Sequence, residues 1–153
     1  MLSIGTEAPE FVLVSTTNQS LSLSSLRGKK VILAFYPADW SPTCSEQLDL
    51  YNESVLLFQK HNAILLGISV DGKWCHRAFS EKKSFDFQLL ADFEPKGAVS
   101  RKYEAFEEKE GQSKRALYLI DENGIIQWSL LSPKNFNPGA DGIMIALKAM
   151  ESK

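Results

Sequence analysis

The sequence has few of the residues that make metal and disulfide sites. Only two cysteines occur among its 153 residues, Cys44 and Cys75, which is too few for a disulfide framework. They lie far apart in the chain, so the CxxC spacing of redox and zinc motifs is absent. With His61 and His76 as the only histidines, no zinc-ligand pattern occurs. We expect no metal site and no bound cofactor.

The chain also lacks a basic cluster and a long apolar run. Its 17 Lys and Arg residues and 19 Asp and Glu residues give a formal net charge of −2. Binding to phosphate groups requires a concentrated positive surface, so nucleic acid is not expected as a partner. No apolar run approaches the roughly 18 residues that cross a bilayer, and no Lys or Arg occurs early in the chain. We expect no membrane association and a cytoplasmic location.

Hydrophobic residues make up 44% of the chain, which is enough to form a core. No internal repeat or linker is visible, so residues 1–153 are expected to form one domain. Apolar runs without alternation are typical of strands covered on both faces, and they occur at 31–36, 63–68 and 116–120. Between the first two, apolar residues at spacings of three and four predict an amphipathic helix over 42–61.

Local signals complete an α/β prediction. The Asn-Gly pair within 121–124 predicts a tight hairpin to a further strand at 125–131, because such a turn needs positive φ. Helices are expected over 73–83, 95–103 and 142–150, the last with Asp141 as its N-cap. These elements predict a central mixed β-sheet flanked by helices.

The reactive groups concentrate where the first strand meets its helix. Ser41 is expected to cap the helix, with Pro42 as its first residue and Cys44 in its first turn. Unpaired backbone N–H groups and the helix dipole favour a thiolate there. The residues alone leave two interpretations of Cys44 open, a reactive thiol or a small buried core residue, since free cysteine is among the most buried types.

The run from Phe35 to Cys44 resembles the peroxiredoxin active-site loop, Pro-x-x-x-[Thr/Ser]-x-x-Cys, with Pro37, Ser41 and Cys44 at its fixed positions. The similarity continues through Ile4-Gly5, Ala8-Pro9-Glu10-Phe11, Leu21 to Lys29, Ser69-Val70-Asp71 and Arg115 to Asp121. Leu90-Ala91-Asp92-Phe93 and Gly97-Ala98-Val99-Ser100 look closest to the alkyl hydroperoxide reductase E and bacterioferritin-comigratory branches. The resemblance implies a thioredoxin-like fold with an N-terminal extension.

It also implies a thiol-dependent peroxidase acting on hydrogen peroxide or small organic hydroperoxides. Cys44 would be the peroxidatic nucleophile, which attacks the O–O bond and becomes a sulfenic acid. Arg115 would hold a positive charge near the sulfur. Ser41 would bond to the sulfur and the peroxide, or cap the helix only. Pro37 would shield the thiolate, although ending a strand is sufficient to explain a proline there.

Three further residues have open roles. Gln47 either bonds to backbone near the loop or lies exposed on the helix. Trp40 either walls an apolar pocket or packs in the core. Cys75, expected in the first turn of the next helix near positive backbone ends, is either a resolving cysteine that forms a disulfide with Cys44 or a bystander. Related branches place the resolving cysteine elsewhere.

The resemblance further implies a thioredoxin- or glutaredoxin-type protein, or a low-molecular-weight thiol, as reductant, and a homodimer. The alternative function is a peroxide redox sensor or a thioredoxin-fold binding protein without significant turnover. A thioredoxin-type disulfide reductase is less favoured, because its chemistry relies on the CxxC pair that this chain lacks.

Overall fold

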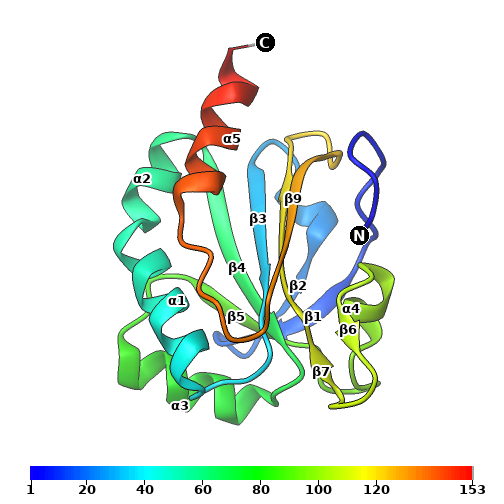
Figure 1. The fold of residues 1–153 in the computed structure, drawn as a ribbon, viewed down its shortest axis with the longest axis vertical. Coiled ribbons are helices and arrows are strands. Elements are labelled where there is room, and N and C mark those ends of the chain that lie inside the picture. Colours follow the sequence, from blue (N-terminus) through cyan, green and yellow to red (C-terminus); the bar gives the residue numbers. More distant parts are fainter. Residues whose placement is uncertain (153) are drawn as a thin grey trace.

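A seven-stranded mixed sheet forms the centre of the computed structural model, which describes residues 1–152 (Figure 1). The strands lie in the order β2-β1-β5-β4-β3-β8-β9. Their bounds are β1 Val12–Ser15, β2 Ser20–Ser22, β3 Lys30–Phe35, β4 Ala63–Ser69, β5 Gln88–Ala91, β8 Arg115–Ile120 and β9 Ile126–Ser132. Two short strands, β6 Phe106–Glu107 and β7 Gln112–Ser113, form a separate ribbon.

The middle of the sheet follows from the continuous apolar runs. Strands β3, β4 and β5 are parallel, whereas β8 is antiparallel to β3 and β9 is antiparallel to β8. Every residue of β3 and β8 is buried, as expected of strands covered on both faces. The predicted central strands, the antiparallel pair and the mixed sheet are therefore confirmed.

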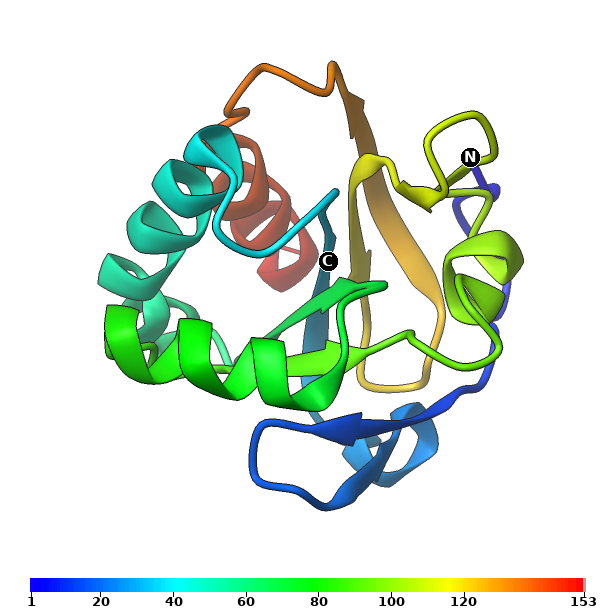
Figure 2. The same ribbon diagram turned by 90° about the horizontal axis from the view of Figure 1, so that it is seen from below.

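Helices cover both faces of the sheet, as Figure 2 shows. One face carries α1 Pro42–Glu53, α2 Val55–Lys60, α3 Lys73–Lys83 and α5 Asp141–Glu151. The other carries α4 Ala98–Lys102, the short 3-10 helix η1 Leu23–Leu26 and the N-terminal segment. Each layer forms its own apolar core, with Leu48, Phe79 and Leu147 in the first and Phe11, Leu23 and Tyr103 in the second.

The helix expected over 42–61 is wrong as a single element, because it is interrupted at Ser54. The Ser54 hydroxyl donates to the carbonyl of Leu50, and its backbone N–H bonds to Tyr51 three residues back. Serine often competes with the helical hydrogen bonds in this way. The helix of 73–83 is confirmed as α3, and its first turn contains Cys75 as expected.

Two helix starts also differ from the sequence prediction. The helix expected over 95–103 begins only at Ala98, because Gly97 has a left-handed backbone with φ 71°. Asp141 is not an N-cap but the first residue of α5, and the preceding Ala140 makes no side-chain capping bond.

In the predicted hairpin between β8 and β9, Gly124 is the residue of the Asn-Gly pair that has positive φ, 84°. No helix in residues 1–152 has the length and apolar character needed to cross a membrane.

Gly97 provides a test of the packing between α4 and the ribbon of β6 and β7. A Cβ added to Gly97 would lie 2.3 Å from a ring carbon of Phe106. We expect Gly97→Ala to lower the free energy of unfolding by about 2–4 kcal/mol, from backbone strain and overpacking together. Gly5→Ala is the matched control, since Gly5 also has positive φ but no atom within 4 Å of the added Cβ. It should cost only about 1 kcal/mol in urea unfolding; equal losses would contradict the steric argument.

Candidate active site

The first turn of α1 holds Cys44 as the sequence predicts. Ser41 is the N-cap, and its Oγ accepts a hydrogen bond of 3.2 Å from the backbone N–H of Cys44. Pro42 is the first helical residue, where its missing N–H has no cost. The Cys44 side chain is completely buried beneath the start of the helix. Its backbone amide and Ser41 are therefore tied together in one capped turn.

Arg115, the first residue of β8, reaches the sulfur of Cys44. Its Nη2 donates to Cys44 Sγ over 3.3 Å, although the two residues lie 71 positions apart. Arg115 is 2% exposed, and its guanidinium is also fixed by the carbonyl oxygen of Lys134, which accepts from Nε at 3.0 Å and from Nη2 at 2.6 Å. A buried, hydrogen-bonded guanidinium is a strong donor to an anion. The positive charge expected near the thiol is therefore present.

Gln47 belongs to the same polar network. Its Oε1 accepts a bond of 2.6 Å from Arg115 Nη1, and its Nε2 donates to the hydroxyl of Tyr51 over 3.0 Å. That hydroxyl in turn donates to the carbonyl of Gly139 over 3.0 Å. Gln47 is completely buried, so the exposed interpretation is wrong, and its partner is Arg115 rather than loop backbone.

Tyr51 is a site residue that the sequence analysis missed. It lies one helical turn after Gln47, and that spacing is the signal that places both side chains on the face of α1 that carries Cys44. Burial raises the pKa of Tyr51 to about 12, so the phenol stays protonated. Lys134 and Gly139 lie in the loop between β9 and α5, so the network ties this loop to the site at two points.

Pro37 and Trp40 belong to the loop that joins β3 to α1. Pro37 is buried directly after the strand. Trp40 is 50% exposed, and its ring centre lies 5.0 Å from that of Phe79 on α3. Trp40 is therefore not a fully buried core residue. Its backbone has φ 71°, an uncommon value for a bulky residue.

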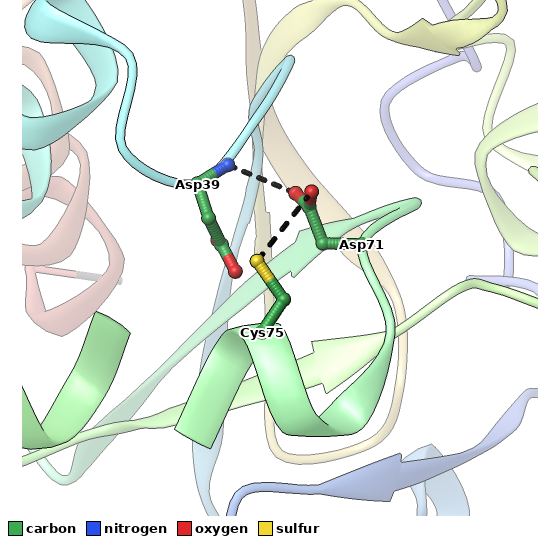
Figure 3. A group of neighbouring side chains, drawn as sticks. All are labelled: Asp39, Asp71 and Cys75. Atoms are coloured by element: carbon green, nitrogen blue, oxygen red, sulfur yellow. Dashed lines mark hydrogen bonds between the residues drawn. The ribbon is translucent and has the colours of Figure 1, made fainter. Parts of the chain in front are cut away.

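Cys75, in the first turn of α3, lies beside the carboxylates of Asp39 and Asp71 (Figure 3). Its Sγ is 4.0 Å from Asp71 Oδ1, and burial together with the charges of Asp39 and Asp71 raises the pKa of Cys75 to about 11. The expectation that the helix start favours its thiolate is therefore wrong. Cys44 and Cys75 are both free thiols.

Asp39, Asp71 and Cys75 are also the residues best placed to hold a cation. Their ligand atoms lie within 4.8 Å of one another, and no other such group occurs in the part of the chain that the structure describes. Asp71 Oδ2 already accepts bonds from the backbone N–H of Asp39 and from Ser69 Oγ. The sequence analysis missed this group because Asp39 lies far along the chain from Asp71 and Cys75.

Comparisons with known proteins identify the family of this chain. The model of the AhpC/TSA family matches residues 4–129. The chain belongs to the AhpC/TSA family. Alkyl hydroperoxide reductase E of Mycobacterium bovis is 35% identical over 130 residues, which cover 84% of this chain and 85% of the relative. Peroxiredoxin 2 of Thermoplasma acidophilum is 32% identical over 154 residues, which cover 97% of this chain and 76% of the relative.

A solved structure agrees with these relatives. The reduced 2-Cys peroxiredoxin of Plasmodium vivax superposes with a TM-score of 0.89 at 29% identity, covering 97% of this chain and 82% of that one. The resemblance to peroxiredoxins and the thioredoxin-like fold are therefore confirmed. This peroxiredoxin is a thiol-dependent peroxidase, an oxidoreductase.

The carboxylates beside Cys75 give a prediction for its reactivity. Alkylation requires the thiolate, so in a Cys44→Ser background the alkylation rate of Cys75 should rise about tenfold per pH unit until the pH approaches its pKa of about 11. Asp71→Asn removes one of the charges that raise this pKa, so alkylation at pH 9 should become faster. Asp49→Asn on the surface of α1 should leave the rate unchanged. A pH profile that levels off near 8.5 would contradict the raised pKa.

Proposed function

We propose that Cys44 is the peroxidatic residue of this peroxidase. The observation that carries the proposal is the contact of 3.3 Å between Arg115 Nη2 and Cys44 Sγ at the capped first turn of α1. A guanidinium donates a stronger hydrogen bond to a thiolate than to a thiol, so it stabilises the nucleophilic form of sulfur. Arg115 is also available to bond the peroxide oxygen on which negative charge develops.

The first step is a two-electron transfer from sulfur to peroxide. The Cys44 thiolate attacks one oxygen of the hydroperoxide, an S–O bond forms and the O–O bond breaks. The departing alkoxide, or hydroxide when the substrate is hydrogen peroxide, takes up a proton and leaves as an alcohol or water. Cys44 becomes a sulfenic acid. This balance requires no metal and no bound cofactor.

Ser41 and Pro37 support this step. The Ser41 oxygen accepts from the amide of Cys44, which leaves its hydroxyl hydrogen free to donate to a peroxide oxygen. Pro37 is buried within the loop and has no N–H that would compete for the sulfur. Gln47 and Tyr51 act through Arg115, since they hold the guanidinium in the orientation that contacts sulfur.

Recycling of the sulfenic acid by an external thiol is the route that the geometry supports best. A thioredoxin- or glutaredoxin-type protein, or a low-molecular-weight thiol, would condense with the sulfenic acid to form a mixed disulfide and water. A second thiol then attacks the reductant sulfur of that disulfide, which releases the Cys44 thiolate and leaves the two reductant sulfurs joined as a disulfide. The cytoplasm fits this cycle because it keeps thiols reduced.

Resolution by Cys75 is the second route. Cys75 contacts Asp71 and has a raised pKa, so attack on Cys44 requires both a lost proton and unwinding of the first turn of α1, where Cys44 is buried. Thiolate is the attacking species in disulfide formation, so a high pKa of Cys75 slows this route at neutral pH.

A homodimer, implied by the family resemblance, completes the proposal. Sedimentation equilibrium, which measures the mass of the protein in solution, tests it.

The contact between Arg115 and Cys44 predicts a loss of rate without a loss of folding. Arg115→Met should lower the second-order rate constant for hydrogen peroxide by about 100-fold, because one preorganised donor to the reacting atoms is removed. Stopped-flow fluorescence measures this constant, and circular dichroism checks the fold. Arg77→Met on the surface of α3 should leave the rate unchanged. Cys44→Ser should abolish the reaction. If that variant consumes peroxide at the wild-type rate, the proposal is wrong.

Intact mass separates the two routes of resolution. After one equivalent of hydrogen peroxide, recycling by an external thiol predicts a gain of about sixteen mass units on Cys44, or thirty-two on further oxidation. A loss of about two units without dimer formation, absent in Cys75→Ser, would show the Cys44–Cys75 disulfide instead. Turnover with a thioredoxin system should be the same in wild type and Cys75→Ser if the external route operates.

A further inference from the structure

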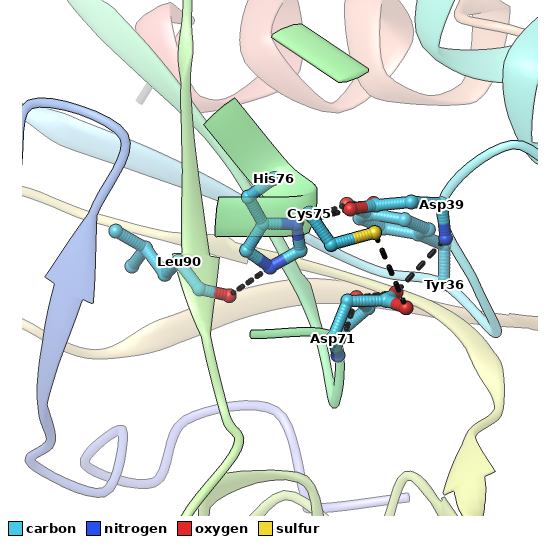
Figure 4. A network of polar contacts seen from close by, with 7 residues as sticks. Tyr36, Asp39, Asp71, Cys75, His76 and Leu90 are labelled. Atoms are coloured by element: carbon cyan, nitrogen blue, oxygen red, sulfur yellow. Dashed lines mark hydrogen bonds and ion pairs between the residues drawn. The ribbon is translucent and has the colours of Figure 1, made fainter. Parts of the chain in front are cut away.

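A buried polar network joins the loop between β3 and α1 to α3 and to the turn after β4 (Figure 4). Its centre is Asp39, whose side chain is completely buried in the loop between β3 and α1. The Tyr36 hydroxyl donates to Asp39 Oδ1 over 2.6 Å, and His76 Nδ1 lies 2.7 Å from Asp39 Oδ2. Within residues 1–152, the hydrogen bond to the sulfur of Cys44 comes from Arg115 and not from Tyr36, Asp39 or His76.

Hydrogen-bond geometry fixes the proton count of the pair formed by Asp39 and His76. His76 Nε2 lies 3.0 Å from the carbonyl oxygen of Leu90, which only accepts, so Nε2 carries a hydrogen. A bare Nδ1 facing a carboxylate oxygen would be repulsive at 2.7 Å. The contact therefore contains one proton, and a buried pair of this kind is strong when every atom is satisfied. Burial and the charge of Asp39 raise the pKa of Tyr36 well above 10, so Tyr36 remains a donor.

The backbone of Asp39 makes a second link. Its N–H donates to Asp71 Oδ2 over 2.9 Å, and Ser69 Oγ donates to the same oxygen over 2.5 Å. The loop is thus tied through its side chain to α3 and through its backbone to the turn that follows β4. Both attachment points lie in the segment that follows β4, the parallel neighbour of β3 in the sheet.

Trp40, the next residue, shows why such a link is needed. Its φ of 71° costs of the order of 1 kcal/mol or more for a bulky residue, and it persists only where the surroundings hold it. Directly after it, Ser41 caps α1 and orients the turn that contains Cys44. Release of Asp39 would let the loop relax away from this conformation and displace the cap.

We propose that Asp39 and His76 are positioning residues that hold the peroxidatic loop closed over Cys44, and that their link opens when the sulfenic acid leaves the site for reduction. This inference rests on the proposed role of Cys44. The link favours attack on peroxide, because it keeps Ser41 and Arg115 around the sulfur, and it slows the following step, because a reductant thiol must reach Cys44. Breaking it should therefore change the two steps in opposite directions.

Two substitutions of similar size at position 39 separate hydrogen bonding from charge. In Asp39→Asn, the amide oxygen still accepts from Tyr36 and the amide nitrogen donates to neutral His76, so the network stays complete. In Asp39→Leu, both bonds are lost. His76→Phe keeps the ring and removes the bonds from the other side. The conservative variant should behave as wild type, whereas the other two should not.

Stopped-flow oxidation and sulfenic acid reduction by dithiothreitol test the two steps, in a Cys75→Ser background. Asp39→Leu and His76→Phe should lower the rate constant for hydrogen peroxide by about tenfold and raise the rate of reduction by about threefold. Asp39→Asn should change neither by more than about twofold. If both steps slow together, the residues are merely structural and the proposal is overturned; it is also overturned if Asp39→Leu oxidises at the wild-type rate.

Hydrogen exchange provides a readout that does not depend on Cys44 being the nucleophile. In the reduced protein, amides of residues 38–44 should exchange faster in Asp39→Leu and His76→Phe than in wild type and Asp39→Asn, while those of β8 should not change. Unchanged exchange in the loop would overturn the inference by itself. If the exchange result holds but Cys44→Ser still consumes peroxide, the proposed role of Cys44 fails while the loop link stands.

Discussion

The buried guanidinium of Arg115 is the group on which the arrangement of the site depends. A positive charge in a protein interior is costly unless its donors are satisfied, and here they bond to the carbonyl of Lys134, the amide of Gln47 and the sulfur of Cys44. These partners come from the loop before α5 and from α1, so the charge joins β8 to both. These hydrogen bonds offset the free-energy cost of burying the charge. They form together only in the arrangement that places the guanidinium of Arg115 beside the sulfur of Cys44.

Two separate groups of contacts act on the loop between β3 and α1 and on the helical turn that follows it. Arg115 contacts Cys44 directly, and it changes the chemistry of the sulfur through charge. Asp39 is bonded to Tyr36 and His76, which constrains the backbone of the loop without a hydrogen bond to the sulfur. No buried side-chain nitrogen or oxygen within residues 1–152 lacks a partner, so both arrangements are complete. The residue that changes the reactivity of Cys44 is therefore distinct from the residues that hold the backbone of the loop in place.

The sequence predicted correctly those elements that depend on interactions between residues close together in the chain. The cap at Ser41 and the uninterrupted apolar strands depend on residues next to one another, and both are confirmed. The break at Ser54 was not predicted, because the apolar spacing continues across it while a hydroxyl competes for the backbone. Strands β1, β2 and β5 were not predicted. Each has at most four residues, and an alternation of apolar and polar residues cannot be recognised over so short a segment.

The site was predictable only in part, for a similar reason. Cys44 and Ser41 lie within one motif, whereas the contact of Asp39 with His76 requires the order of strands in the sheet. Gln47 has the spacing of a core residue, but its polar side chain indicated the surface until Arg115 provided a partner. Cys75 was placed in the correct helical turn, but burial and the carboxylate of Asp39, from a distant segment, join Asp71 in reversing the expected electrostatics.

Arg115 is anchored by a main-chain carbonyl, that of Lys134, rather than by a side chain. Every amino acid presents the same carbonyl oxygen, so the residue at position 134 is free to vary as long as the loop keeps its path. Substitutions in this loop are therefore limited by the length and backbone conformation of the loop, and much less by the identities of its amino acids. A comparison of residue identities would score the segment as dispensable, although it orients the guanidinium beside the reactive sulfur.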